Sequence, residues 1–424
     1  MTSPPSLIPS LRIQPLGVRP KYKTQPARHA PMTLPILQLL PGKERSVERG
    51  HLWVFSGALA PKNPQPPDGA LVEVRASNSR FLARGQYQQS GAIRVRILTR
   101  EPEQIDHEFW TRKLRAAIAI RNRLGLLDGP DTTAARLVNG EGDFLPGLII
   151  DYFAGNVVIQ THSRGMELAC KDIANALIEA LEDRACFICH KPVYIGPDTA
   201  GEKVSTLYGE PVEPWFRENG FRFRLDWAEG QKTGFFLDQR DHRAMLSRYA
   251  SGRTLLNAFS YTGAFSVYAA AAGAAEVITL DSSERAIQQA KLNLEANGFA
   301  TAASNVVVGE TLRYLKEAQR GFDLIVLDPP AFAKRLSARH SAVQGYKRLN
   351  LEALRNLNPG GILFTFSCSQ AVDASLFNGT ITAAVIESGR NARILHRLAQ
   401  PADHPINPCH PESEYLKGLI LTVD

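Results

Sequence analysis

The chain has 424 residues, a length that suits two or three domains better than one. Hydrophobic residues make up 44% of it and charged residues 21%, which is the composition of a globular protein with a sizeable core. No apolar run approaches the roughly 18–20 residues that cross a bilayer. Five cysteines are too few for a disulfide framework, so we expect reduced thiols and a cytoplasmic location.

The net charge of +7 is unevenly distributed. The first 31 residues hold five basic residues and no acidic one, so seven minus five leaves +2 for the rest. Overall basicity is therefore weak evidence for a nucleic-acid partner, and an RNA-binding surface must be a local patch. Residues 1–31 are rich in proline and lack apolar periodicity, which predicts a disordered tail or an over-called start before Met32.

The next two segments differ in pattern. Residues 32–104 contain short strands separated by turns, and Ile93–Leu98 alternates apolar residues with Arg94 and Arg96, which predicts a small β-barrel with a basic exterior. Residues 105–216 mix helical and strand patterns, which predicts a central α+β domain. Helices are expected near 104–124 and 167–181, and a strand pair at 148–151 and 157–160.

From residue 217 to 424 strands alternate with helices, which predicts a Rossmann-like α/β domain. The strand 254–259 runs into a turn at Gly263, and the next strand ends on Asp281. This arrangement is typical of a nucleotide-like ligand held at the carboxyl edge of a sheet, with the acid on ribose hydroxyls. The motif G-x-G-x-x-G is missing, which disfavours a dinucleotide cofactor. A third strand is expected to end near Glu310.

Two later strands carry the candidate chemistry. The strand 322–327 ends in Asp328-Pro329-Pro330-Ala331-Phe332, and 361–366 ends in Ser367-Cys368-Ser369 after a helix at 347–357. Prolines stiffen the first loop, and such a loop can flank a base that has left its stack. Because these strand ends should be neighbours, we expect Cys368 to be a nucleophile that adds to C6 of a cytosine while Asp328 assists at N3. Carbon 5 then accepts a methyl group, and no base for the C5 proton is evident.

The sequence resembles a known family at this point: the single-cysteine class I methyltransferases that form 5-methylcytosine in large-subunit ribosomal RNA. Residues 40–43 with 51–57 resemble its PUA domain, a small RNA-binding barrel, and 136–148 its central domain. The most specific block is Gly230–Arg240. The resemblance implies S-adenosylmethionine as cofactor, RNA (23S ribosomal RNA) as partner, no metal, no membrane and a tendency to form a homodimer.

The resemblance also implies roles for individual residues. Catalysis falls to Cys368 and Asp328. Residues that contact the cofactor are expected to be Gln231, Thr233, Phe236, Asp238, Arg240, Asn257, Phe259, Ser260, Tyr261, Gly263, Asp281, Ser282, Glu310 and Thr311. Residues that contact the substrate are expected to be Pro329, Pro330, Phe332, Lys334, Tyr346 and Lys347. Glu310 replaces the aspartate common in the family, which puts its contact in doubt.

Two other functions stay open. Methylation of a guanine or an exocyclic amine in RNA would need the Asp-Pro-Pro loop but no thiol. A non-catalytic RNA-binding assembly factor would need neither. Two further patterns resemble metal or haem sites: Cys186–His190 matches c-type haem attachment, and His404, Cys409 and His410 form a local cluster. Neither has the further ligands or export signal that such a site requires, so we expect no haem and no metal.

Overall fold

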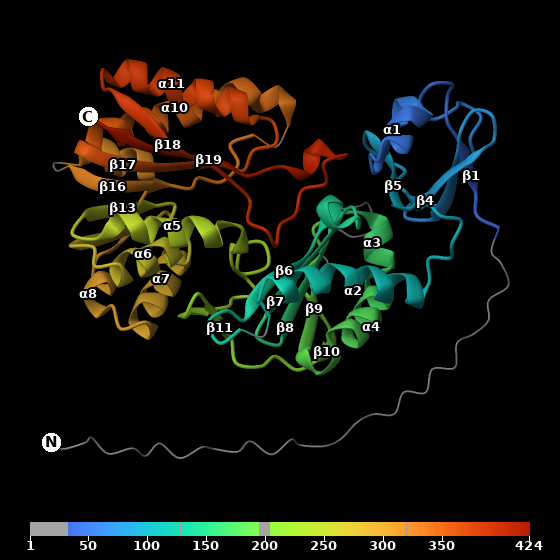
Figure 1. Cartoon of the computed structure of the whole chain (residues 1–424), viewed down its shortest axis with the longest axis horizontal. Helices are drawn as coiled ribbons and strands as arrows, with labels where there is room; N and C mark the ends of the chain where they lie inside the picture. Colours follow the sequence, from blue (N-terminus) through green and yellow to red (C-terminus); the bar gives the residue numbers. More distant parts are fainter. Residues whose placement is uncertain (1–32, 128, 195–203, 319–320, 334) are drawn as a thin grey trace, which may run out of the picture. The chain divides into compact units, whose positions relative to one another are not determined.

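The computed structural model describes residues 33–127, 129–194, 204–318, 321–333 and 335–424. The predicted tail at 1–31 and the candidate Lys334 lie outside these ranges. No helix in the described part of the chain is both long and apolar enough to span a membrane. The strands form a five-stranded sheet, a second five-stranded sheet, a two-stranded hairpin and a seven-stranded sheet (Figure 1).

The first sheet has the order β1-β3-β4-β5-β2 and encloses a core that includes Val72, Val74 and Ile97. The predicted alternation in β5 is confirmed for Val95 and Ile97, which are buried. Arg94 and Arg96 are half-buried instead of fully exposed, so they do not form an open basic face. The elements of this part are β1 (Ile36–Gln38), α1 (Glu44–Glu48), β2 (Trp53–Phe55), η1 (Ser56–Ala58), β3 (Leu71–Arg75), β4 (Phe81–Tyr87) and β5 (Ile93–Thr99).

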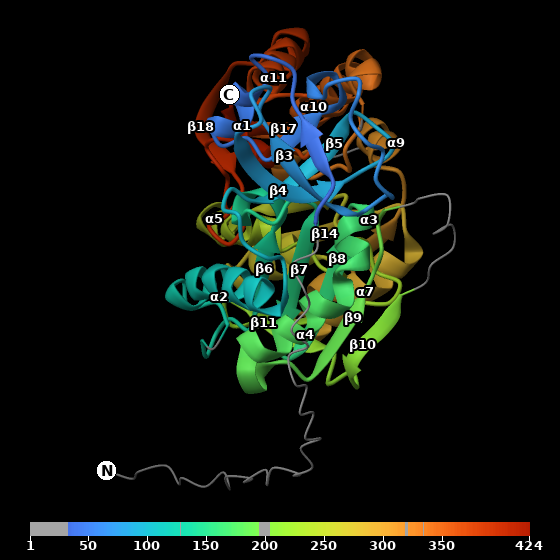
Figure 2. The ribbon, with the colours of Figure 1, turned by 90° about the vertical axis from the view of Figure 1, so that its right-hand side faces the viewer.

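The second sheet has the order β10-β9-β8-β7-β6, and helices α2 and α4 pack together on one of its faces (Figure 2). Asp106 caps α2 by accepting a hydrogen bond from the Phe109 amide. The predicted 167–181 helix is two helices, α3 and α4. The elements are α2 (His107–Arg123), β6 (Ala134–Asn139), η2 (Gly140–Asp143), β7 (Leu148–Phe153), β8 (Asn156–Thr161), α3 (Arg164–Leu168), α4 (Cys170–Leu181), η3 (Glu182–Arg184), β9 (Phe187–His190) and β10 (Ser205–Gly209).

The other face of this sheet packs against an antiparallel hairpin, β11 (Trp215–Glu218) with β12 (Phe221–Arg224). Phe216 and Phe223 of the hairpin share one core with Phe153 of β7 and Tyr268 of the C-terminal part. The hairpin therefore joins the central part of the chain to the C-terminal part. The predicted domain limit at 216/217 falls inside β11, and the limits at 31/32 and 104/105 stay predictions.

The third sheet has the order β15-β14-β13-β16-β17-β19-β18. Strands β13 to β17 are parallel, and β19 runs antiparallel to both of its neighbours. Alternate residues of β16 serve opposite layers: Leu324 and Val326 join the core with α5 and α6, whereas Ile325 and Leu327 join the core with α10 and α11. Figure 1 shows these helix pairs on opposite faces of the sheet. Burial on both faces explains the continuous apolar strands.

The predicted helix at 347–357 begins earlier, at Arg339, and the expected stop at 358–360 lies within β17. The elements of this part are η4 (Leu237–Gln239), α5 (Arg240–Ala250), β13 (Thr254–Ala258), α6 (Ala264–Ala271), β14 (Glu276–Asp281), α7 (Glu284–Ala296), α8 (Ala300–Ala303), β15 (Val306–Val308), α9 (Thr311–Glu317), β16 (Phe322–Leu327), η5 (Leu336–Ala338), α10 (Arg339–Asn356), β17 (Leu357–Ser367), α11 (Ala374–Ser388), β18 (Ala392–Ala399), η6 (Pro411–Ser413) and β19 (Lys417–Val423).

The segment 400–416, between β18 and β19, reaches back to the central part of the chain. Arg121 donates to the carbonyl oxygen of Asp403 at 2.6 Å, and the Arg136 amide donates to the Asp403 carboxylate at 3.2 Å. The Asn139 side chain donates to the carbonyl of Pro405. Each bond joins residues more than 260 positions apart. This segment therefore fixes the central sheet against the third one.

Candidate active site

The two strand ends expected to carry catalysis are neighbours. β16 and β17 pair in parallel, with Leu327 opposite Thr365, one residue before Asp328 and three before Cys368. The loops beyond them are tied together, because Ser369 Oγ donates to the carbonyl of Ala333 at 2.7 Å. The prediction that these strands lie side by side is confirmed.

Asp328 has the electrostatics of a proton donor. Burial, together with the nearby charge of Asp238, raises the pKa of its carboxyl to about 7, while Lys232 and a hydrogen bond from Gln239 act in the opposite direction. An ordinary aspartate is ionised at neutral pH. At pH 7 Asp328 therefore exists in both protonated and ionised forms, and it can donate a proton to a ring nitrogen.

The thiol of Cys368 is half-buried. Burial raises its pKa, and the nearby carboxylates of Asp328 and Asp238 raise it further, whereas the ammonium of Lys232 lowers it. The resting group is therefore a thiol, which must lose its proton to become a nucleophile. The loop behind it is held by Lys417, whose Nζ donates to the carbonyls of Ser369 at 2.7 Å and Val372 at 2.8 Å.

Asp238 lies close to this pair of groups and is buried. Its Oδ2 accepts a hydrogen bond from Tyr415 Oη at 2.8 Å and lies 3.5 Å from Lys232 Nζ. Burial opposes ionisation, yet the charges of Lys232 and Arg136 and the hydrogen bond from Tyr415 hold the pKa of Asp238 well below its usual range. Its Oδ1 is buried without a partner in the structure. An ionised oxygen without a donor is a suitable place for an ammonium group of a ligand.

The turn after β13 has the backbone of a ligand-binding loop. Phe259, Tyr261 and Gly263 all have positive φ, of 56°, 46° and 72°. Such conformations are costly for residues other than glycine and cluster at binding sites. Ser260 Oγ is buried without a partner, and Asp281, at the end of β14, accepts the Tyr261 amide at 2.9 Å.

Gly263 also has a packing role that the sequence did not reveal. It is the N-cap of α6, and a Cβ at this position would lie 2.7 Å from the Cβ of Ala290 on α7. Glycine is therefore required both by its backbone conformation and by the close approach of the two helices.

The block 231–240 contacts the turn after β13 through a few of its residues. The Gln231 amide donates to Tyr261 Oη at 2.9 Å, and the rings of Phe236 and Tyr261 lie edge to face with centroids 5.1 Å apart. Lys232 lies over the Phe236 ring at 4.4 Å and has a φ of 49°. These residues place the block beside the turn that comes after β13.

Other expected cofactor residues have structural partners. Thr233 Oγ1 donates to Asp151 of the central sheet at 2.6 Å, and Arg240 is buried in ion pairs with Asp403 at 2.9 Å and Glu218 at 3.5 Å. Asn257 donates to Ser266 Oγ of α6. The structure thus gives these three side chains positions in the framework around the site.

The last three residues expected to contact the cofactor, Ser282, Glu310 and Thr311, differ in exposure and in their contacts. Glu310 is exposed, and its carboxylate caps α9 by accepting the amides of Leu312 and Arg313. Thr311 is buried beside it, and Ser282 is exposed. The side chain of Glu310 therefore folds back onto its own helix, and both of its carboxylate oxygens are engaged there.

The expected substrate residues lie along the Asp-Pro-Pro loop and α10. Pro329 is buried and Pro330 exposed, while Phe332 is 36% exposed and lies against the buried Tyr346 ring with centroids 4.5 Å apart. Lys347 forms an ion pair with Glu387 of α11 at 2.5 Å. Phe332 is thus supported by Tyr346 and still open to a base, whereas Lys347 is engaged elsewhere.

Four residues that the sequence did not single out complete the site: Lys232, Gln239, Tyr415 and Lys417. Lys232 and Gln239 lie within the block 230–240, so adjacency could have suggested them. Tyr415 lies near the end of the segment 400–416 and Lys417 is the first residue of β19, whose antiparallel pairing with β17 brings both of them here. The haem-like motif is structural, since Cys189 is fully buried in β9 and His190 contacts Thr161 Oγ1 at 2.8 Å.

Comparison with known proteins gives a consistent result. A family model described as S-adenosylmethionine-dependent methyltransferase matches residues 159–420, and one described as PUA-like domain matches 37–100. The protein named ribosomal RNA large subunit methyltransferase I from Aeromonas salmonicida is 39% identical over 391 residues, which cover 91% of this chain and 98% of the relative. The protein of the same name from Shewanella amazonensis is 38% identical, with 91% and 99% covered.

Solved structures share the fold. A SAM-dependent methyltransferase from Streptococcus mutans has a TM-score of 0.79 at 23% identity, covering 92% of this chain and all of the other. A methyltransferase complexed with SAH has a TM-score of 0.80 at the same identity and coverage.

Proposed function

Because this chain belongs to the S-adenosylmethionine-dependent methyltransferases, in the family of ribosomal RNA large subunit methyltransferase I, we propose that it methylates carbon 5 of a cytosine in 23S ribosomal RNA. The observation that carries the proposal is the placement of Cys368 and Asp328 at adjacent strand ends. A thiol beside a carboxyl group that is partly protonated at pH 7 suits attack on a pyrimidine ring. Transfer to a guanine or an exocyclic amine gives no role to the thiol.

The residues present fit the cofactor. Buried Ser260 Oγ and Asp238 Oδ1 lack partners, and Gly263 lets the backbone turn tightly at the start of α6. We propose that Asp238 and the block 231–240 hold the methionine end, while the turn 257–263 and Asp281 hold the nucleoside. S-adenosylmethionine, when bound, supplies an electrophilic methyl group.

The chain's own residues carry the remaining steps. Cys368 gives its proton to solvent and its sulfur forms a bond with C6 of the cytosine, while Asp328 donates a proton to N3 so that negative charge does not accumulate on the ring. Addition to C6 shifts the π electrons of the C5=C6 double bond toward C5. C5 is then nucleophilic and takes the methyl group. Loss of the C5 proton to solvent reforms the C5=C6 double bond and breaks the S–C6 bond, so that the sulfur leaves as a thiolate. The proton on N3 returns to Asp328.

The site also suggests how the base is held. Phe332 is partly exposed and rests on Tyr346, so its ring can stack on a pyrimidine that has left the RNA helix. The first sheet, which the PUA-like model matches, is the proposed RNA-binding part. The cytoplasmic location and the homodimer stay predictions; sedimentation at micromolar concentration tests the latter.

The test uses RNA that carries 5-fluorocytosine, because fluorine at C5 cannot leave as a proton. The wild-type protein should form a complex with this RNA that survives denaturing electrophoresis and depends on S-adenosylmethionine. Cys368→Ala should form none and should also fail to methylate normal RNA. Cys409→Ser, which changes another accessible thiol, is the matched control and should behave like wild type. Methyl transfer at the wild-type rate by Cys368→Ala would exclude covalent catalysis.

A further inference from the structure

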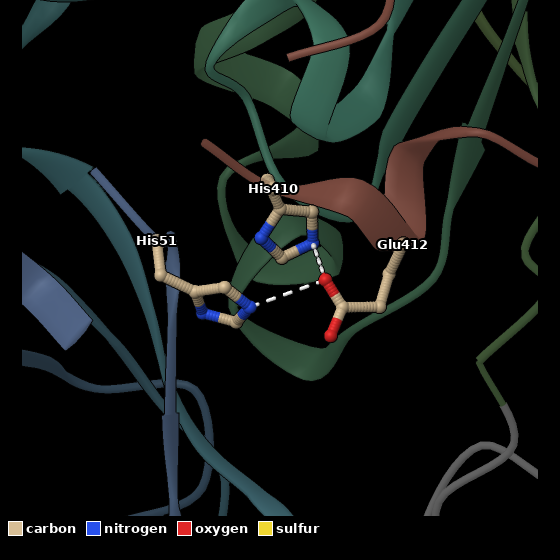
Figure 3. Close-up of side chains that lie close together, drawn as sticks. All are labelled: His51, His410 and Glu412. Atoms are coloured by element: carbon tan, nitrogen blue, oxygen red, sulfur yellow. Dashed lines mark hydrogen bonds and ion pairs between the residues drawn. The ribbon is translucent and has the colours of Figure 1, made fainter. Parts of the chain in front are cut away.

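A second group of chemistry-bearing side chains lies outside the active site, where the approach to β2 meets the C-terminal segment. His51, His410 and Glu412 each offer one ligand atom, and these atoms all lie within 4.8 Å of one another (Figure 3). His51 precedes β2, whereas Glu412 lies in η6, 361 positions later. The three residues His404, Cys409 and His410, which are close in sequence, therefore do not form one group in the fold. His404 turns to Asp403 at 3.0 Å, and His410 joins His51 instead.

The distances within the group leave room for an ion. His51 Nε2 lies 3.2 Å from Glu412 Oε2, and His410 Nε2 lies 3.8 Å from the same oxygen. The two imidazole rings lie with their centroids 4.3 Å apart and their planes tilted by 42°. Both nitrogens and the carboxylate oxygen point toward one another, as Figure 3 shows. Two imidazoles and one carboxylate form a ligand set that zinc uses in sites with an open fourth position.

A buried polar atom independently points to a ligand. His410 is fully buried, and its Nε2 has no hydrogen-bond partner in the structure. A buried nitrogen without a hydrogen bond costs free energy unless something binds it, and the contact with Glu412 Oε2 at 3.8 Å is too long to be a hydrogen bond. On one side the ring is closed off by Trp53, whose centroid lies 4.4 Å away. On the other side Glu412 is 40% exposed, which gives an ion access from solvent.

The Nδ1 atoms of His51 and His410 must carry the ring proton when the Nε2 atoms bind a metal ion. His51 Nδ1 lies 3.1 Å from the carbonyl of Trp53 and 3.2 Å from the Trp53 amide, so it donates to the carbonyl in one tautomer and accepts from the amide in the other. Donation to a carbonyl is the usual outer contact of a metal-ligating histidine. His410 Nδ1 accepts from the Leu52 amide at 3.4 Å. Ligation through Nε2 places the proton of each ring on Nδ1 and gives up two hydrogen bonds, from the Trp53 amide to His51 at 3.2 Å and from the Leu52 amide to His410 at 3.4 Å. We therefore expect a site weaker than a closed four-ligand site.

We propose that His51, His410 and Glu412 bind a divalent transition metal ion of the zinc type, which joins the first sheet to the C-terminal segment. The proposal replaces the expectation of no metal drawn from the sequence. It is independent of the reaction at Cys368, because the reaction proposed there needs no metal.

The first experiment measures binding of Zn²⁺ alone to the full, metal-stripped chain by titration calorimetry. Wild type should bind one equivalent. Glu412→Gln and His51→Ala, both at partly exposed positions, should each lower the affinity at least about tenfold. His107→Ala is the matched control, since His107 is an exposed histidine paired with Glu179 at 2.7 Å, and its affinity should equal that of wild type. Equal affinity of all four proteins would overturn the proposal.

The second experiment separates this site from the free thiols. Co²⁺ bound by imidazole and carboxylate gives visible bands without the strong near-ultraviolet thiolate band, so wild type loaded with one equivalent should lack that band. Cys409→Ser should keep the same spectrum and affinity. A thiolate band that Cys409→Ser or Cys186→Ser abolishes would mean that the metal binds at cysteine instead. A second measurement guards against misfolding: circular dichroism of the Glu412→Gln and His51→Ala proteins should match that of wild type.

Discussion

Replacing Asp328 by asparagine should stabilise the folded chain at alkaline pH. The pKa of this carboxyl is raised to about 7 from 3.8, first by burial and then by Asp238. Ionising it in the folded chain therefore costs free energy that the unfolded chain does not pay. Stability from this group is complete below pH 3.8 and is lost as pH rises through about 7. The difference corresponds to about 4 kcal/mol, reduced to about 2–4 kcal/mol because the residue is only half-buried.

The assay is urea unfolding of wild type and Asp328→Asn between pH 5 and 8.5. The variant should be about 2–4 kcal/mol more stable than wild type at pH 8.5, and the difference should shrink toward pH 5. Methyl transfer should fall about 10²- to 10⁴-fold, since the amide cannot give up a proton. The matched control is Asp323→Asn at the other end of β16. Hydrogen bonds from Asn358 and the Thr254 amide lower the pKa of Asp323, so its loss should destabilise the chain at neutral pH. A stabilisation of Asp328→Asn that does not change with pH would refute the reasoning.

Three further substitutions test the framework of the site. Gly263→Ala should lower the free energy of unfolding in urea by about 2–4 kcal/mol, because of the positive φ and the contact with α7. Gly298→Ala, with φ of 85° and open space around it, should lower it by only about 1 kcal/mol. Equal losses would count against the clash. Glu218→Gln should lower the free energy of unfolding by about 3 kcal/mol or more, because Arg243 stays charged and buried. In the wild type two nitrogens of Arg243 donate to the Glu218 carboxylate at 2.7 Å. A loss below about 1 kcal/mol would contradict this. Lys417→Met should lower kcat about tenfold, since the loop after Cys368 loses two hydrogen bonds. Calorimetry with S-adenosylmethionine should give an unchanged affinity. Weaker binding of the cofactor would argue for a different role of Lys417.

Local patterns predicted the strands of the third sheet well. The apolar run 322–327 is β16, and the turn at Gly263 begins α6 as expected. Both features depend on neighbours in sequence and on burial of both sheet faces, which leave a clear pattern. The start of α10 at Arg339 was missed, because only partners distant in sequence, such as the Ala371 carbonyl that accepts from Arg339, fix that end.

Side-chain roles were harder to predict than strand positions. Thr233 and Arg240 belong to the most specific sequence block, yet they bind Asp151 and Asp403. A motif identifies a location and does not distinguish a residue that contacts a ligand from one that supports the loop. The sequence cluster around His410 showed only part of the group, because His51 comes from the opposite end of the chain.

The segment 400–416 has a consequence for the order in which the chain folds during synthesis. Arg121 and Arg136 are buried, and each contacts Asp403, which the ribosome adds more than 260 residues later. Until then these two cationic residues, on α2 and β6, lack a partner that they have in the native state. Contacts of such long sequence separation form late and slow the final step of folding. A nascent chain that stops before residue 400 can pair the strands of the central sheet but lacks the hydrogen bonds to Asp403. Its central part is therefore less stable until the last segment arrives.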